Sequence, residues 1–417
     1  MNSNNVVTAE TKISSYLNYF WFGFSLYSIA FAFPAKTQLL VYIFQILQLC
    51  GIVIFVPAAY QLINWNINNT YLKSVIIILL IWSLSVLSRG FNFKYEFIKR
   101  MLIYANDGLF MYLAPLIVLF PTRIKYLRKV FNLIIIFGIF FIIFDLYQLN
   151  VLRYAITGSR IATGTVENLI QCLAVPSGFI LLSYYYHPKK INVMAIVILL
   201  VALYFTIIRA RRSLTFVTLS LMLVSYIMLL IYSKEKLLKL FLSFFTLVFL
   251  ISSIALLYSA QRSGFFGHFD SRLKEETRQG VEEAFYNDMS TTDWLIGKGI
   301  NGSYYCPDID EGYRITVNRD TIETGYLQII LRGGIISLGL FLLAAVPALF
   351  KGLFASNNML CKAAGSWILL FLIYSYPTTI NWFILSTILI WISIGLCFNK
   401  SIRKKTDEEI LEELNSY

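Results

Sequence analysis

The chain has 417 residues, of which 58% are hydrophobic and only 14% are charged. A soluble domain carries about 25% charged residues, so the composition excludes a chain that folds in water throughout. It predicts an all-α polytopic membrane protein. The net charge is +12, and the basic residues lie mostly in short connections, where they orient spans. No soluble basic face suited to nucleic acid is evident, so nucleic acid is not an expected partner.

About twelve apolar stretches are long enough to cross a bilayer as helices. They fall at roughly 16–33, 37–60, 72–88, 98–120, 128–149, 166–186, 191–208, 213–232, 237–258, 325–350, 361–376 and 378–398. The chain then divides into helices one to nine over 1–258, a large loop at 259–324, helices ten to twelve over 325–398, and a tail at 399–417. The large loop holds seven basic and twelve acidic residues.

Basic residues predict which connections face the cytoplasm. With a cytoplasmic N-terminus, the inside connections hold clusters at 123–129, 189–190 and 234–239, and the C-terminal tail is also basic at its start. Both termini are therefore predicted to be cytoplasmic, and the loop at 259–324 extracytoplasmic. The tail segment 406–417 is acidic and amphipathic and is expected to form a short solvated helix.

Three outside connections are basic against this rule, at 89–100, 153–160 and 209–212. A topology that is wrong by one helix would explain them. Their convergence on the side that carries the large loop favours a second interpretation, in which arginines face an anionic substrate at the outer leaflet. Arginine near a membrane is costly and usually has a partner or a cavity.

The turn at 209–212 carries Arg209, Arg211 and Arg212 between two apolar runs. Arg209 and Arg212 are three residues apart, so they share a face if the turn is helical. Guanidinium groups match phosphate geometry in a bidentate manner. The alternative is an interfacial hairpin with snorkelling side chains. Acidic residues at outer helix ends, among them Asp145 and Glu167, are expected to pair with a neighbouring arginine.

The large loop ends in polar residues that run directly into an apolar span, namely Arg314, Arg319, Asp320 and Glu323. Glu323 is expected at the membrane boundary, where partial burial would favour its protonated form and a nearby arginine its ionised form. A carboxylate so placed is a candidate general base. The alternative is a carboxylate that complements the dipole of the following helix. The adjacent glycines 333 and 334 predict a close approach by a helix or a ligand.

These features resemble bacterial O-antigen polymerases of the Wzy type and the related O-antigen ligases. The resemblance rests on the many spans, on the large loop before the last three, and on Tyr326-Leu327 followed by glycines at 333, 334 and 339. The ligases carry His-Asn at the start of this pattern, whereas Glu323-Thr324 stands here, which favours a polymerase. An Arg-x(10)-Gly spacing also occurs twice, from Arg153 to Gly164 and from Arg314 to Gly325.

The resemblance implies a GT-C-like, metal-independent glycosyltransferase of the bacterial cytoplasmic membrane that needs no cofactor. It would polymerise repeat units carried on undecaprenyl diphosphate into O-antigen or capsule-type polysaccharide at the outer face of that membrane. The expected partners are donor and acceptor glycans on undecaprenyl diphosphate and the membrane lipids, and a chain-length regulator is a further candidate.

Under this hypothesis, arginines bind the diphosphates and stabilise the departing charge. The residues assigned to this role are Arg209, Arg212, Arg314 and Arg319, supported by Arg211, Arg153 and Arg160. Glu323 would activate or position the acceptor hydroxyl, with Asp320 in reserve. Aromatic residues of the loop and its end would stack on sugars, namely Trp294, Tyr304, Tyr305, Tyr313 and Tyr326.

Three other functions stay open. A ligase would transfer finished glycan to a lipid A core. A flippase or transporter of lipid-linked sugar would fit arginines in the membrane, but it would not need a large acidic loop, and no inverted repeat is evident. A structural membrane subunit would leave the outer arginines unexplained.

Overall fold

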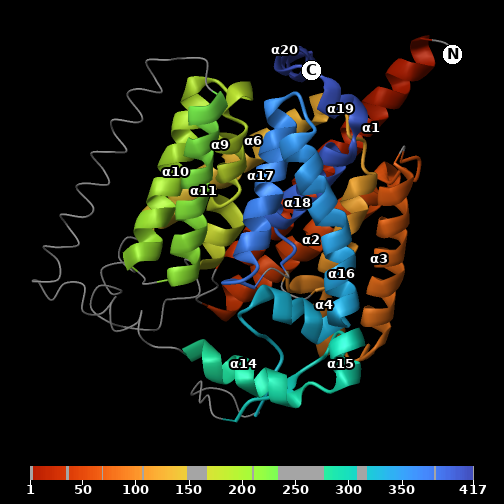
Figure 1. Ribbon diagram of the computed structural model, residues 1–417, viewed down its shortest axis with the longest axis vertical. Helices are drawn as coiled ribbons and strands as arrows, with labels where there is room; N and C mark the ends of the chain where they lie inside the picture. Colours follow the sequence, from red (N-terminus) through yellow and green to blue (C-terminus); the bar gives the residue numbers. More distant parts are fainter. Residues whose placement is uncertain are drawn as a thin grey trace, which may run out of the picture.

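The helices run side by side between two ends of the molecule, and both termini lie at the same end (Figure 1). The end that carries the termini is called the termini end below, and the opposite one the loop end. The computed structural model describes residues 3–33, 37–67, 69–105, 108–147, 167–208, 211–232, 277–307, 317–379 and 382–416. The expected span at 237–258 lies outside these residues, as do Arg153, Arg160, Arg209, Arg314 and Tyr313.

The first half of the chain builds both flanks of the bundle and part of its loop end (Figure 1). Its elements are α1 (Ser3–Ala32), α2 (Gln38–Leu62), α3 (Thr70–Ser88), α4 (Tyr95–Ile103), α5 (Leu109–Leu113), η1 (Ala114–Leu119), α6 (Ile124–Tyr147), η3 (Ile170–Ala174), α9 (Ser177–Leu182), η4 (Tyr184–Tyr186), α10 (Lys189–Ile208) and α11 (Arg212–Tyr232).

The second half adds the segment that covers the loop end and the last helices of the bundle (Figure 1). Its elements are α14 (Thr277–Asp288), α15 (Thr291–Ile296), β1 (Tyr304–Tyr305), β2 (Asn318–Arg319), α16 (Gly325–Phe354), α17 (Met359–Tyr374), α18 (Leu385–Phe398), α19 (Lys400–Lys404) and α20 (Asp407–Asn415). The described residues 277–307 and 317–324 are called the loop segment below.

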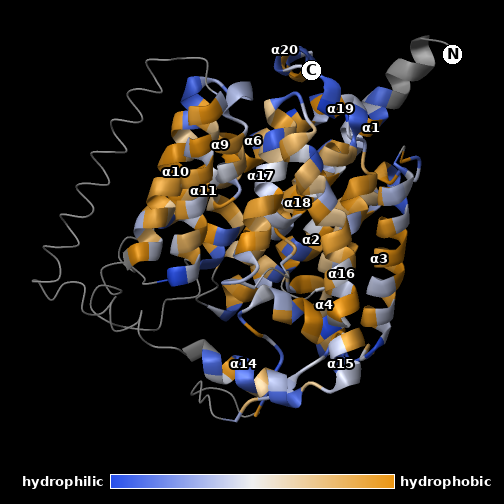
Figure 2. Cartoon of the chain, viewed as in Figure 1, coloured by the Kyte–Doolittle hydropathy of each residue, from blue (hydrophilic) through white to orange (hydrophobic). Residues whose placement is uncertain are grey.

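Six of the described helices are long and apolar enough to cross a membrane, namely α2, α3, α6, α10, α11 and α16. Shorter apolar helices cover Leu109–Leu119, Glu167–Leu182, Met359–Tyr374 and Leu385–Phe398. Hydrophobic residues occupy the middle of the bundle, and hydrophilic ones gather toward its ends and on α14 (Figure 2). The chain is therefore a helical, multi-pass membrane protein, while the number of twelve spans stays a prediction.

The expected span at 98–120 is not one helix, because the chain breaks between α4 and α5. The carbonyl of Ile103, the last residue of α4, accepts hydrogen bonds from Gln48 Nε2 at 2.8 Å and from the Tyr27 hydroxyl at 3.3 Å. The carbonyl of Ala105 accepts from Phe383 N at 2.8 Å. Buried carbonyls that leave a helix need such partners, and here α1, α2 and the segment before α18 provide them.

A second break lies inside α16, at Gly334. Gly334 has φ 69° and ψ −176°, a conformation that essentially only glycine adopts. The break releases three carbonyls from the helical ladder, and each finds a donor elsewhere. The bonds join Leu331 O to Lys298 N at 2.8 Å, Arg332 O to Gly299 N at 2.9 Å, and Gly333 O to Trp82 Nε1 at 3.0 Å.

The break gives α15 a place to pack against α16. A side chain at Gly334 would lie 2.5 Å from Ile296 N, and one at Gly297 would lie 2.5 Å from Gly333 N. The adjacent glycines thus serve a close approach between helices, as the sequence predicts for positions 333 and 334. The part of α16 before the break lies across the loop end, and the part after it runs along the bundle (Figure 1).

The loop segment has a small hydrophobic core of its own. Phe285 and Tyr304 are almost fully buried there, and Leu331 of α16 closes it. The Tyr304 hydroxyl donates to Thr321 O at 3.0 Å. The expectation that Tyr304 stacks on sugars is therefore wrong, because its ring faces the core, whereas Tyr305 is exposed.

The C-terminal helix α20 docks on the bundle and is not the solvated helix expected from its charge. Ile410 and Leu414 are buried. At its start, Asp407 accepts hydrogen bonds from the Tyr186 hydroxyl and, at 2.7 Å, from Met359 N. A capping box on Thr406 fixes the first turn.

Near α20, His187 lies at the connection between η4 and α10 and packs edge-on against Phe131. Its Nε2 is 3.0 Å from Ser183 Oγ. Because the Ser183 hydroxyl already donates to Phe179 O at 2.7 Å, Nε2 carries the hydrogen and donates to Ser183. Desolvation lowers the pKa of His187 from 6.5 to about 4. The imidazole is therefore neutral at pH 7.

This pKa predicts how stability changes with pH. Between pH 6.5 and about 4 the unfolded chain takes up a proton at His187 and the folded chain does not. The free energy of unfolding should therefore fall as the pH falls through this window. Thermal unfolding of the purified protein at a series of pH values measures the slope, which His187→Gln should flatten. Lys190→Gln, at an exposed position three residues further along the chain, is the control and should leave the slope unchanged.

Candidate functional site

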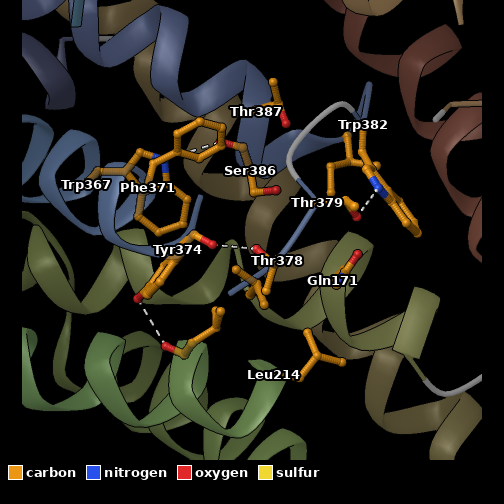
Figure 3. A pocket seen from close by; sticks show the side chains of 13 residues that line it. Gln171, Leu214, Trp367, Phe371, Tyr374, Thr378, Thr379, Trp382, Ser386 and Thr387 are labelled. Atoms are coloured by element: carbon orange, nitrogen blue, oxygen red, sulfur yellow. Dashed lines mark hydrogen bonds between the residues drawn. The ribbon is translucent and has the colours of Figure 1, made fainter. Parts of the chain in front are cut away.

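A cleft near the loop end lies between η3, α11, α17 and the start of α18 (Figure 3). Its empty volume is about 560 Å³. The described residues that line it are all uncharged: Gln171, Val175, Leu214, Val217, Trp367, Phe371, Tyr374, Thr378, Thr379, Trp382, Ile384, Ser386 and Thr387. Four aromatic side chains thus share one hollow with five side chains that carry an amide or a hydroxyl group, not counting the tyrosine. This is the usual make-up of a site for a neutral organic ligand.

Hydrogen bonds fix the aromatic walls of the cleft. The Tyr374 hydroxyl donates to Val217 O at 3.0 Å, and Trp367 Nε1 donates to Ser386 O at 3.2 Å. Trp382 Nε1 donates to Thr379 Oγ1 at 3.2 Å (Figure 3). The ring positions are therefore set before any ligand arrives, which lowers the entropic cost of binding.

Gln171 enters the cleft from an unusual turn. Residues Ile170–Ala174 form a π-helix, in which Val175 N bonds to Ile170 O at 2.9 Å. Pro176 follows and has no N–H to continue the ladder. Single π turns inside helices are frequent at functional sites, since they re-aim one side chain. Here the polar atoms of Gln171 and Ser386 face the open space of the cleft (Figure 3).

An ion pair lies one helical turn from the cleft, between Arg211 and Glu167. Glu167 precedes Gln171 by four residues, and Arg211 directly precedes α11, three residues before Leu214. Each member of the pair therefore lies within four residues of a residue of the lining. The expected pairing of Glu167 with an arginine is confirmed. The Arg211 side chain is still 38% exposed, so one edge of the guanidinium faces outward.

The other expected arginines of the described chain lie at the same end but in different settings. Arg212 is the first residue of α11 and is exposed. Arg319 lies in β2, which pairs with β1 of the loop segment. The carboxylate of Asp320 is 4.0 Å from Arg100 Nη1. Thus Arg211 and Arg212 lie at the start of α11, which forms one wall of the cleft, whereas Arg319 and Asp320 belong to the loop segment.

Glu323 and Tyr326 stand at the start of α16. Glu323 is exposed and directly precedes the N-cap Thr324, so the expected partial burial is absent. Its position just before α16 fits the alternative interpretation, in which the carboxylate complements the dipole of that helix. The Tyr326 hydroxyl donates to Leu372 O, and Tyr326 N donates to Ser375 O at 3.2 Å. These bonds tie α16 to the end of α17 that forms a cleft wall, so Tyr326 braces the wall.

The basic connection at 89–100 holds the loop segment in place. Arg89 donates from Nη1 to Gly297 O at 2.9 Å and from Nη2 to Ile296 O at 2.6 Å. Arg100 donates to Asn301 Oδ1. These contacts give the arginines of this connection a structural role, since they bind protein carbonyls and an amide.

Arg332 is a functional candidate that the sequence interpretation overlooked. It is only 4% exposed and donates to three carbonyls, those of Ile300 at 2.7 Å, Gly302 at 2.8 Å and Asp320 at 2.7 Å. A single guanidinium thereby joins two stretches of the loop segment to α16, one just before β1 and one just after β2. The signal was present, because Arg332 interrupts an apolar run and an arginine inside a span points to a partner.

Among the described residues, no three His, Cys, Asp or Glu side chains lie close enough together to hold a metal ion. Comparisons of the chain with family models, with characterised proteins and with solved structures find no match. The fold and the site define a helical membrane protein with an uncharged, aromatic cleft near one end and an arginine–glutamate pair beside it.

Proposed function

We propose that the protein is a lipid-linked polysaccharide polymerase, with twelve spans in a GT-C-like arrangement in the bacterial cytoplasmic membrane and the loop end on the outer side. It joins repeat units carried on undecaprenyl diphosphate. The observation that carries the proposal is the uncharged cleft with an arginine beside it, because the donor combines a neutral glycan with a diphosphate.

The cleft suits the glycan part of the donor. Aromatic faces such as those of Trp367 and Trp382 can pack against the apolar face of a sugar ring. Gln171, Ser386 and Thr387 supply groups that both donate and accept hydrogen bonds, as sugar hydroxyls require. Because the lining of the cleft is uncharged, it gives ionic solutes no advantage over a neutral glycan.

Arg211 and Arg212 suit the diphosphate. Guanidinium groups bind phosphate oxygens through two parallel hydrogen bonds. Both residues lie at the start of α11, where the helix dipole also favours negative charge. Glu167 fixes Arg211 in advance, so little reorganisation is needed when charge develops on the leaving group.

The proposed reaction is a displacement at the anomeric carbon of the donor. A hydroxyl oxygen of the acceptor forms the new C–O bond, and the bond between the anomeric carbon and the diphosphate oxygen breaks. Undecaprenyl diphosphate leaves with the electron pair, held by Arg211 and Arg212. Glu323 accepts the hydroxyl proton in this scheme, because it is an exposed carboxylate three residues before Tyr326, which is bonded to the end of α17.

Replacing Arg211 by glutamine should slow polymer formation by about 10²–10³-fold, the usual loss when one donor to a developing charge is removed. The assay incubates purified protein with lipid-linked repeat units and follows the ladder of lengths on a gel. Arg211→Lys should keep part of the activity, since it retains the charge but not the bidentate geometry. Lys190→Gln, at the termini end, is the control. A normal ladder from Arg211→Gln would contradict the assignment.

The same assay separates the alternatives. A polymerase lengthens the repeats stepwise in detergent, whereas a ligase moves finished glycan once to a lipid A core. A flippase changes only the sidedness of the substrate in vesicles and makes no new bond. Glu323→Gln tests the proton transfer, because an unaltered ladder from this variant would remove Glu323 from the mechanism.

A further inference from the structure

A second hollow lies at the termini end, at the opposite end of the bundle from the cleft. Three connections surround it: the one from α2 to α3, the one from η1 to α6, and the one from α18 to α19. Its empty volume is about 1400 Å³, and its lining combines amide, hydroxyl and basic side chains with apolar ones. This hollow is called the crevice below.

The asparagines of the crevice offer donors. Asn69 Oδ1 accepts from Leu72 N at 2.9 Å and caps α3. Asn64 Oδ1 accepts from Asn66 N at 3.0 Å. Because each of these carboxamide oxygens is bound to the backbone, what each side chain offers a ligand is its NH₂ group.

The side-chain oxygen of Asn399 is also bound to backbone N–H groups. Its Oδ1 accepts from Ser401 N at 3.1 Å and from Ile402 N at 3.3 Å, which caps α19. Its Nδ2 donates to Thr122 Oγ1 at 3.3 Å, so Thr122 accepts there and keeps its hydroxyl hydrogen to donate. The Ser401 hydroxyl donates to Asn399 Oδ1 at 2.7 Å, so Ser401 offers the crevice an acceptor, whereas the asparagine amides and Thr122 offer donors.

The charged residues around the crevice also favour an anionic ligand. Arg123 and Lys400 line the crevice, and none of the described lining residues is acidic. The nearest carboxylate in the described contacts is that of Glu10, which pairs with both Arg123 and Lys125. Two cations thus share one carboxylate, and Lys400 adds a further positive charge to the lining, so the excess positive charge favours an anion.

The floor of the crevice is apolar, with Leu72, Val118 and Phe398 among its residues. We propose that the crevice binds a phosphate group, presented by a lipid headgroup or by a soluble phosphate compound. Phosphate oxygens are acceptors that match the amide, hydroxyl and guanidinium donors. The termini end is also rich in basic residues, which attract anionic lipid surfaces. This inference does not depend on the proposed polymerase activity.

The experiment measures the thermal midpoint of the purified full-length protein in neutral detergent as ligand is added. Phosphatidic acid is compared with diacylglycerol of the same chains, which differs only by the phosphate. Inorganic phosphate is compared with chloride at equal ionic strength. Phosphatidic acid, phosphate or both should raise the midpoint. A response to the lipid alone identifies a headgroup site, and a response to inorganic phosphate identifies a site for soluble phosphate.

Two variants test the location. Lys400→Gln removes a crevice cation, and Asn66→Asp places a carboxylate at an exposed crevice position. Each should weaken the apparent affinity about tenfold, as expected for losing or opposing one charge-assisted contact. The double variant Lys189→Gln/Lys190→Gln is the control, because it removes two exposed charges at the same end outside the crevice. An equal loss in the control, or no response to either phosphate probe, would overturn the proposal.

Discussion

Alanine in place of Gly334 is expected to destabilise the protein by about 2–6 kcal/mol. Two effects add. The conformation of Gly334, with φ 69°, is strained for any L-residue by about 1–3 kcal/mol. The new Cβ would also lie 2.5 Å from Ile296 N and closer still to the Leu295 carbonyl, and overpacking of this kind costs about 1–3 kcal/mol. Backbone atoms of α15 cannot rotate away, so α15 must separate from α16.

Gly339 provides a matched control five residues further along the same helix. A Cβ there meets nothing within 4 Å, so Gly339→Ala should leave the thermal midpoint unchanged or raise it, because alanine favours helix by about 0.5–1 kcal/mol. The two midpoints are measured in one detergent. Hydrogen exchange at Gly299 N, which bonds to Arg332 O, reports whether α15 has come away. Equal midpoints for the two variants would show that the break at Gly334 does not hold α15.

The sequence predicted this region in part. The paired glycines indicated a close approach, and the structure confirms it between α15 and α16. What the sequence could not indicate is the break itself, because the 30 residues of α16 are mostly apolar and predict one span in spite of Arg332. The break is stable only because Lys298, Gly299 and Trp82 supply donors for the released carbonyls, and these residues are remote in sequence.

The prediction of one helix over 98–120 was wrong for the same reason: the break depends on residues that are remote in sequence. Hydrophobicity measures whether a segment prefers lipid, but it does not report whether a helix continues. The break after Ile103 depends on Gln48 and Tyr27, which lie 55 and 76 residues away along the chain. Composition and apolar length therefore gave the helical membrane class, whereas the interruptions of helices depend on tertiary hydrogen bonds.

The candidate site, too, could be predicted from the sequence only in part. Arg211 and Glu167 could be selected because charges at the ends of apolar runs are conspicuous in a sequence. The cleft beside them could not, because its lining consists of ordinary aromatic and hydroxyl residues from four segments of the chain. The basic residues at 89–100 show the opposite error, since charge against the topology rule suggested an anionic substrate and Arg89 binds backbone carbonyls.

Arg332→Gln is expected to release the loop segment from the bundle. The guanidinium donates to the carbonyls of Ile300, Gly302 and Asp320 in a setting where only 4% of the residue is exposed. Hydrogen bonds to a charged group contribute about 1.5–3 kcal/mol each, and buried carbonyls left without a donor add to the loss. Glutamine can reach one of the three at most. A local loss of about 3 kcal/mol would speed hydrogen exchange in the loop segment by roughly 10²-fold.

Arg100→Gln tests whether burial, and not charge alone, makes Arg332 important. Arg100 also contacts the loop segment, through Asn301 and through Asp320 at 4.0 Å, but its side chain is 41% exposed. Exposed pairs contribute about 0–1 kcal/mol, so this variant should change exchange by less than about fivefold. If the proposed polymerase activity needs an ordered loop segment, only the Arg332 variant should also lose the ladder. Equal exchange in the two variants would mean that the hydrophobic core around Phe285 holds the segment without the buried arginine.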